Sequence, residues 1–335
     1  MNLKKFFIYS SLTTATAIMP MAAVACNKVT KENIKIELKN PFYSIPVEEY
    51  SKVGNLFNQQ VTYKYRNPIT REAKEISSSL WDYFQYAEGI VKSYADGDTI
   101  RITITKQPAS HYEYANNVKP EDLQKTFTTS SVTIRNPMID TLEQNTQPGN
   151  EDSLSEREVA LANIDTEHAK NMMPVGTKVR IIFDLASKSY DRYIGWIFFG
   201  DNFEKQYDIE MLASGFTLAR INKNALGLFR SDYPEISTTN PSNSIMSYLL
   251  PYAAYAYNIA SVEKRGYYNP ETTFLNSDEK VNIPNIVALS KEYIAHGSSI
   301  LEDGKSILYP KLWPSSFGEA TPKNNIYSYF WNLKK

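Results

Sequence analysis

The chain has 335 residues, of which 42% are hydrophobic and 13% aromatic, enough to bury a sizeable core in one large domain or two modest ones. The formal net charge is -1, and -3 without Lys4 and Lys5, which excludes a global positive field that attracts nucleic acid. The single cysteine excludes an internal disulfide.

The first 26 residues have the pattern of a bacterial export signal. Lys4 and Lys5 precede an apolar stretch that ends in small side chains, directly before Cys26. This ending resembles the lipobox of bacterial lipoproteins. The resemblance implies that residues 1–25 are a signal peptide, that Cys26 carries lipid, and that the mature protein is held at the extracellular face of the cell membrane. The alternative is a plain secretory signal with an incidental cysteine.

Two segments flank the central part of the chain. Residues 26–86 are polar and weakly periodic, and we expect a spacer or extension that lifts the body off the membrane. No later apolar run is long enough to cross a bilayer. Residues 271–335 are again less periodic, and we expect a C-terminal extension; a separate adhesive or substrate-binding unit is the alternative.

Between these segments, residues 87–270 show the hydrophobic periodicities that are typical of strands and helices. Ile100, Ile102 and Ile104 alternate with polar residues, and Asp96-Gly97 before them predicts a hairpin turn. Further strands are expected at 132–139, 178–183 and 193–199, and helices at 155–173, 208–214 and 245–265. This order favours an α+β fold, namely a five-stranded OB-fold barrel with helices packed on it.

Three polar segments stand out within this region. Asp98 has the strand parity of Ile100, so its carboxylate is expected to face the interior, where a hard cation is a suitable partner. Arg135 lies near a strand end, with Asp140 and Glu143 just beyond it. An arginine fork matches a phosphate. Structural interpretations stay open for each segment: a simple turn at 96–99, a salt bridge between Arg135 and Glu143, and, for the third segment, a solvated arginine at the start of a strand.

The third segment is Tyr190-Asp191-Arg192, at the entrance to a predicted strand. Together the three segments resemble the staphylococcal nuclease, or thermonuclease, family, which shows DGDT, then R-x4-D-x2-E, then Y-x-R before a strand. All three patterns occur here in that order, and the resemblance covers roughly residues 87–269. The chain departs from the family at Leu142, where proline is usual, and at Tyr193, where glycine is common; we expect the first change to loosen the loop that carries Glu143.

The resemblance implies a calcium site and a phosphate site side by side. Asp98 and Asp140 are expected to bind Ca²⁺ together with the backbone carbonyl of Thr141, and Asp96 is expected to support them. In this arrangement the cation cancels carboxylate charge that otherwise repels the substrate.

The resemblance also assigns the catalytic roles. Glu143 is expected to activate the attacking water, Arg135 and Arg192 to stabilise the charge that develops on the phosphate, and Tyr190 to contact the nucleotide. The three histidines are far apart and lack the spacing of a zinc site.

We therefore expect a membrane-anchored, calcium-dependent nuclease that acts on DNA and RNA for nucleotide salvage, with nucleic acid and the membrane as partners and no oligomer implied. The alternative is a catalytically silent surface lipoprotein that uses the nuclease fold to bind nucleic acid or a protein partner.

Overall fold

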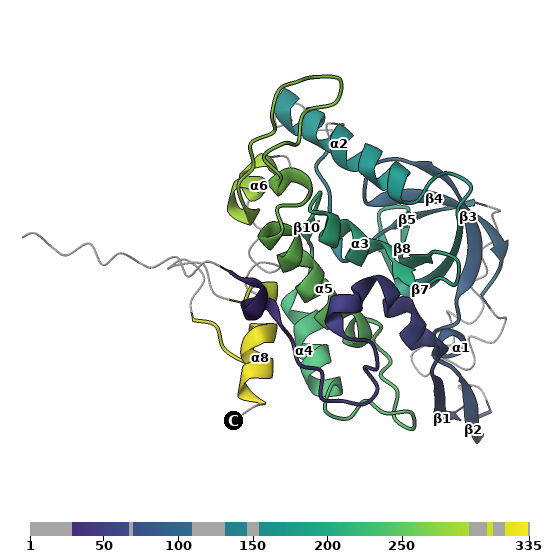
Figure 1. The fold of residues 1–335 in the computed structure, drawn as a ribbon. Helices are drawn as coiled ribbons and strands as arrows, with labels where there is room; N and C mark the ends of the chain where they lie inside the picture. Colours follow the sequence, from purple (N-terminus) through teal and green to yellow (C-terminus); the bar gives the residue numbers. More distant parts are fainter. Residues whose placement is uncertain are drawn as a thin grey trace, which may run out of the picture.

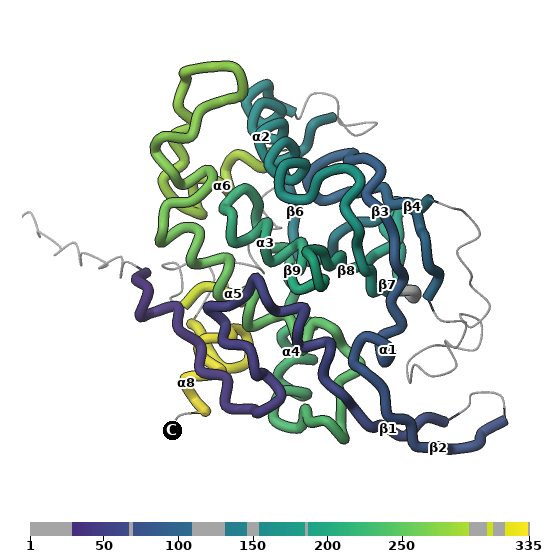
Figure 2. Tube along the Cα trace, turned by 45° about the vertical axis from the view of Figure 1, so that its right-hand side comes forward, coloured from purple at the N-terminus to yellow at the C-terminus, as the bar shows by residue number. Residues whose placement is uncertain are grey.

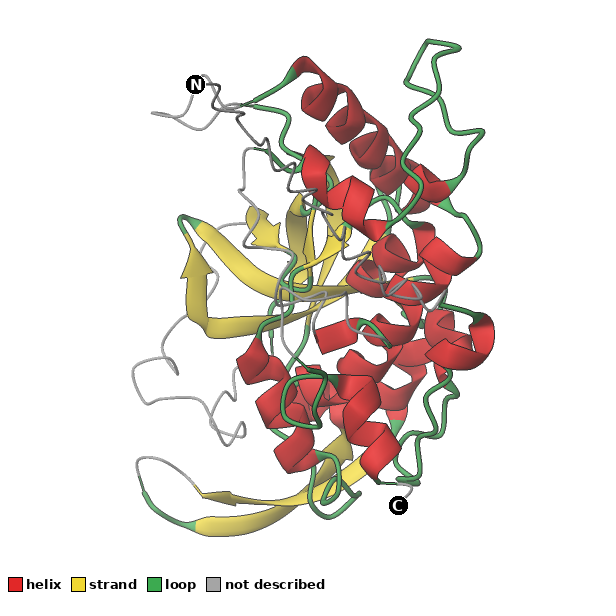
Figure 3. Ribbon diagram, turned by 90° about the vertical axis from the view of Figure 1, so that its left-hand side faces the viewer, coloured by secondary structure: helices red, strands yellow, loops and turns green. Residues whose placement is uncertain are grey.

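A mainly antiparallel sheet with helices gathered along one side of it makes up most of the molecule, so the α+β class is confirmed (Figures 1 and 3). This computed structural model describes residues 29–66, 70–108, 131–145, 154–294, 307–310 and 319–333. The expected signal peptide and Cys26 lie outside the described residues. The same holds for most of the stretch between the predicted strands at 100–104 and 132–139.

The strands form one large sheet and two small ones. The large sheet has the order β5-β4-β3-β7-β8-β9, and β5 also pairs with β8 in parallel, so β5 has neighbours on both edges. The β1–β2 ribbon extends from the body on its own (Figure 1), and β6 pairs with β10. The strands are β1 Gln60–Arg66, β2 Ala73–Ser79, β3 Ala87–Tyr94, β4 Thr99–Lys106, β5 Ser131–Arg135, β6 Ile139–Asp140, β7 Lys178–Ser189, β8 Arg192–Phe199, β9 Lys205–Gln206 and β10 Leu218–Ala219.

The helices begin and end where their sequences provide caps. The Ser155 side chain accepts the Glu158 N–H at the start of α2, and Gly215, with φ +79°, ends α3. In the described part of the chain, no helix is long and apolar enough to cross a membrane. The helices are η1 Lys31–Ile34, η2 Val47–Asn58, α1 Leu80–Phe84, α2 Glu156–Met172, α3 Tyr207–Ser214, α4 Lys223–Asp232, α5 Met246–Val262, η4 Gly266–Tyr268, α6 Ile286–Glu292 and α8 Ile326–Asn332.

Helix α5 lies at the centre of the helical layer and is buried on nearly all sides. Pro251 interrupts its hydrogen bonding, because proline has no N–H to donate to the carbonyl of Ser247, four residues earlier. The hydroxyl of Tyr43 donates to that carbonyl instead, at 2.5 Å. A residue of the N-terminal segment therefore completes a helix of the central body.

The N-terminal segment packs closely wherever it is described. Ile34 and Phe57 are fully buried, and η1 and η2 both contact α5. The purple tube of Figure 2 accordingly runs alongside α5 and close to α8. Residues 29–58 thus form an extension packed on the body, and no spacer is present among them.

Several predicted elements are confirmed and others need correction. The β3–β4 hairpin turns at Asp96-Gly97, and α2 and α3 lie where they were predicted. The predicted strand 132–139 is wrong in extent, because the chain leaves the sheet after Arg135, where Pro137 offers no N–H for strand pairing. The last predicted helix ends at Val262 rather than at 265, and the β1–β2 ribbon and α4 were not predicted at all.

Candidate functional site

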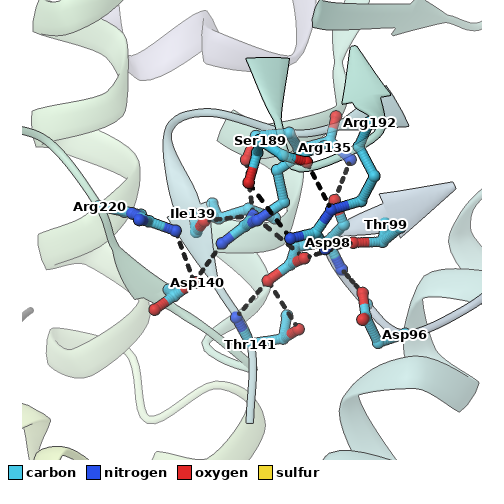
Figure 4. Close-up of polar contacts among 12 residues, drawn as sticks. Asp96, Asp98, Thr99, Arg135, Ile139, Asp140, Thr141, Ser189, Arg192 and Arg220 are labelled. Carbon is cyan, nitrogen blue, oxygen red and sulfur yellow. Dashed lines mark hydrogen bonds and ion pairs between the residues drawn. The ribbon is translucent and has the colours of Figure 1, made fainter. Parts of the chain in front are cut away.

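The three polar segments meet at one end of the large sheet (Figure 4). Sheet register brings the first two together, because Thr99 at the start of β4 pairs with Arg135 at the end of β5. The backbone N–H of Asn136 donates to the Asp98 carbonyl at 2.9 Å and adds a second link between the two segments. β8 begins at Arg192 and pairs with β5 on its other side, which adds the third segment.

Arg135 lies between the two aspartates predicted as calcium ligands. Its Nη1 is 3.1 Å from Asp98 Oδ1, and its Nη2 donates to Asp140 Oδ1. Nη1 also contacts the carbonyl oxygens of Asn136 at 2.7 Å and Ile139 at 2.9 Å. Only 4% of Arg135 is exposed. These contacts occupy most of the N–H donors of Arg135. Because the guanidinium forms ion pairs with both buried carboxylates, it offsets their negative charge.

Asp98 is held as a carboxylate by its surroundings. The Thr141 N–H and hydroxyl both donate to Asp98 Oδ2, at 3.0 and 3.1 Å, and the Thr99 hydroxyl donates to Oδ1 at 2.9 Å. Burial by itself raises the pKa of Asp98, but the Arg135 guanidinium and the Thr141 hydrogen bond outweigh it and hold the pKa below its usual value. Asp98 is therefore charged at neutral pH.

Arg192 joins this network from the other side. Its Nη1 donates to the Thr99 hydroxyl at 2.8 Å, and its Nη2 donates to the Ser189 hydroxyl at 3.2 Å. Tyr190, at the tip of the β7–β8 hairpin, is 82% exposed and has a left-handed φ of +56°. The Arg192 guanidinium lies 5.9 Å from the centre of its ring. An exposed aromatic ring beside a half-buried arginine is suited to a base next to its phosphate.

Asp96 supports the turn that carries Asp98. Its Oδ1 accepts the Asp98 N–H at 3.0 Å, the bond of an Asx turn. Burial and the neighbouring Asp98 charge raise the pKa of Asp96 to about 7. Asp96 thus holds the turn through the backbone of Asp98.

Glu143 lies half-buried on the loop that follows β6, two residues after Thr141. Leu142, between them, donates its N–H to Asp165 Oδ2 at 3.2 Å, a bond that the usual proline cannot make. The expectation of a loosened loop is therefore wrong at this residue. In a trans peptide the carbonyl points opposite to the N–H, so the Thr141 carbonyl points away from Asp165.

Sequence reasoning missed the buried groups behind this site. Asp165 is fully buried on α2, and burial raises its pKa well above the usual value. The Tyr207 hydroxyl donates to the Gly97 carbonyl at 2.7 Å. One signal was available: Asp165 is spaced four residues from Leu161 and from Ala169, on the buried face of the helix.

Arg220 is a further residue that the motifs did not include. Its N–H donates to the Met138 carbonyl at 2.8 Å, which places the residue directly after the β6–β10 pairing. Its Nη1 lies 3.5 Å from Asp140 Oδ1, and its side chain is 53% exposed. It adds a third guanidinium to the site, beside those of Arg135 and Arg192 (Figure 4).

No family model matches the chain, and a search of curated proteins finds no match either. The assignment of this site therefore rests on its residues and their geometry. Among the described residues, no group of three or more His, Cys, Asp and Glu side chains is placed to hold a metal. The predicted ligand set has two carboxylates and a backbone carbonyl, so water or substrate oxygens must complete it.

Proposed function

We propose that this chain is a calcium-dependent nuclease of the staphylococcal-nuclease type, anchored by lipid at the outer face of a membrane, and that it hydrolyses phosphodiester bonds of DNA and RNA for nucleotide salvage. The observation that carries the proposal is the convergence of Asp98, Arg135, Asp140 and Arg192 in one network from three segments of the chain. The pairing of β5 with both β4 and β8 supports the finer proposal of a five-stranded OB-fold barrel.

The donor set fits a hard divalent cation in ligand type. Asp98 and Asp140 would hold Ca²⁺ through carboxylate oxygens, and Thr141 through its carbonyl. Bound calcium supplies Lewis-acid polarisation of the phosphate and a template for its alignment. Both carboxylates also contact Arg135, so Ca²⁺ and the guanidinium would have the same two aspartates as partners.

The remaining roles fall to side chains nearer the solvent. Glu143 accepts a proton from the attacking water, and Arg192 donates to the non-bridging oxygens as negative charge grows on them. Tyr190 stacks on a base beside the scissile phosphate. The arginines of the site, rather than the charge of the whole chain, would attract the phosphate, which is consistent with a net charge of -1.

The second candidate is a silent nuclease-fold module that binds nucleic acid or a protein partner. The burial of Arg135 between two carboxylates favours it, because a guanidinium engaged in this way stabilises structure without touching a substrate. The two candidates differ in whether the chain cleaves DNA.

The deciding experiment measures cleavage of a labelled DNA strand by the detergent-solubilised full-length chain, with calcium and with a chelator. We expect cleavage only with calcium, and losses of about 10²–10⁴-fold in kcat for Glu143→Ala and Arg192→Ala. Arg66→Ala, on the distant β1–β2 ribbon, is the matched control and should retain full activity. Equal cleavage by all four proteins contradicts the assigned roles, and DNA binding without any cleavage supports the silent module.

A further inference from the structure

The C-terminal segment is attached to the helix that backs the candidate site. Arg157 of α2 donates to the Val281 carbonyl at 2.7 Å and to Glu292 Oε2 at 3.0 Å. The Ile294 N–H donates to Glu158 Oε2 at 3.2 Å. Helix α6 is held between these contacts and lies beside β10 (Figure 1).

Tyr293, directly after α6, reaches from this segment to the strand that carries Asp140. Its ring is buried, and its hydroxyl donates to the Asp140 carbonyl at 2.7 Å. The same hydroxyl accepts the Leu218 N–H at 3.2 Å. Because Leu218 pairs with Asp140 in the β6–β10 sheet, Tyr293 bridges the two strands at this pair. The Thr217 hydroxyl also donates to the Asp140 carbonyl, at 2.7 Å.

The strand held in this way needs support, because β6 and β10 are only two residues long and strands of that length are marginal without further contacts. A shift of one residue in this pairing turns the Asp140 carboxylate to the opposite face. The carboxylate then leaves Arg135 and Arg220. The position of Asp140 therefore depends on hydrogen bonds to its own carbonyl.

We propose that Tyr293 is a positioning residue of the site: through the Asp140 carbonyl it fixes β6 in register and so aims the Asp140 carboxylate. The C-terminal segment, which lies beyond the region that resembles the nuclease family, thereby completes the site. The consequence for calcium and catalysis rests on the proposed function, whereas the consequence for the order of β6 does not.

The test compares Tyr293→Phe with Tyr252→Phe in the full-length chain. Both substitutions remove one hydroxyl from a buried ring, and the Tyr252 hydroxyl donates to the Ile45 carbonyl at 2.6 Å, in a different part of the molecule. The first measurement is hydrogen exchange at the Thr141 amide, which bonds to Asp98 and reports the register of the adjoining β6. We expect exchange to be about tenfold faster in Tyr293→Phe and unchanged in Tyr252→Phe.

The second measurement is calcium affinity by titration calorimetry, with DNA cleavage beside it. Tyr293→Phe should lower calcium affinity or kcat by about 10–100-fold, as loss of a group that orients a ligand does, whereas Tyr252→Phe should not. If the wild type neither binds calcium nor cleaves DNA, the proposed function fails, and exchange at Thr141 still decides the positioning role. Equal Thr141 exchange in the two variants overturns that role, whatever the activity.

Discussion

Gly97 lies at the turn between β3 and β4 and has no room for a side chain. A Cβ built on it approaches Thr141 Cγ2 to 2.7 Å and Asp165 Oδ1 to 2.8 Å. Both neighbouring residues are held by hydrogen bonds, because the Thr141 N–H donates to Asp98 and the Asp165 carboxylate accepts from the Leu142 N–H. The glycine of the DGDT pattern is therefore required by close packing beneath the site.

We predict that Gly97→Ala destabilises the fold by about 1–3 kcal/mol, the usual range for a forced overlap in a packed interior. Gly227→Ala is the control, because a Cβ at that position in α4 meets no atom of the described residues within 4 Å. Alanine there should add about 0.5–1 kcal/mol of stability. Urea unfolding of the three proteins measures both effects. If Gly97→Ala has the same midpoint of urea unfolding as the wild type, the packing argument is refuted.

At the scale of elements, α2 is joined to the segment after α3 through an aromatic contact. The centroids of the His168 and Phe216 rings lie 4.5 Å apart, and among the described residues the buried Nε2 atom of His168 has no hydrogen-bond partner. Burial lowers the pKa of His168 to about 4. The imidazole packs as a neutral ring, so protonation weakens the attachment of α2.

This lowered pKa predicts how stability varies with pH. An unfolded histidine titrates near pH 6.5, so the folded state has its full stability above that pH and loses it as the pH falls toward about 4. His168→Phe should remove about 1–3 kcal/mol of the difference in unfolding free energy between pH 7 and pH 4.5. Phe216→Leu keeps the histidine and should keep most of that difference. If the unfolding free energy of His168→Phe varies with pH as that of the wild type does, His168 is not the source of this pH dependence.

At the scale of the whole molecule, segments from both ends of the chain pack onto the central body. Ile34 is fully buried only eight residues after Cys26, and those residues span at most about 30 Å when extended. The lipid proposed on Cys26 would consequently keep the body close to the membrane. On the other side, the rings of Tyr233 and of Phe330 in α8 meet edge to face with their centroids 5.1 Å apart, so the C-terminal helix shares the same core.

For the membrane anchor we predict that the wild-type chain partitions into the detergent phase and that Cys26→Ser moves it to the aqueous phase. Mass analysis should find a diacylglycerol adduct on Cys26 of the mature wild-type protein. DNA cleavage in detergent should be equal in both proteins, since Cys26 has no part in the proposed site. An unmodified Cys26 at the mature N-terminus contradicts the anchor.

Much of the fold and part of the site follow from local patterns. Strand parity places Asp98 on the buried row of Ile100, and Asp96-Gly97 specifies the hairpin turn. The β1–β2 ribbon was missed although Val61, Tyr63 and Tyr65 alternate in the sequence, because weak alternation in a polar segment does not predict a strand by itself.

The sequence by itself determined the turn at Asp96-Gly97, the buried strand row of Asp98 and the place of Arg192 at the start of a strand, because turn chemistry and side-chain parity are local. Only the tertiary structure decided that Arg135 lies between Asp98 and Asp140, and that Tyr293 reaches Asp140 from the C-terminal segment. Those contacts join residues up to 153 positions apart. They depend on sheet register and helix packing across the whole core, which no local pattern encodes.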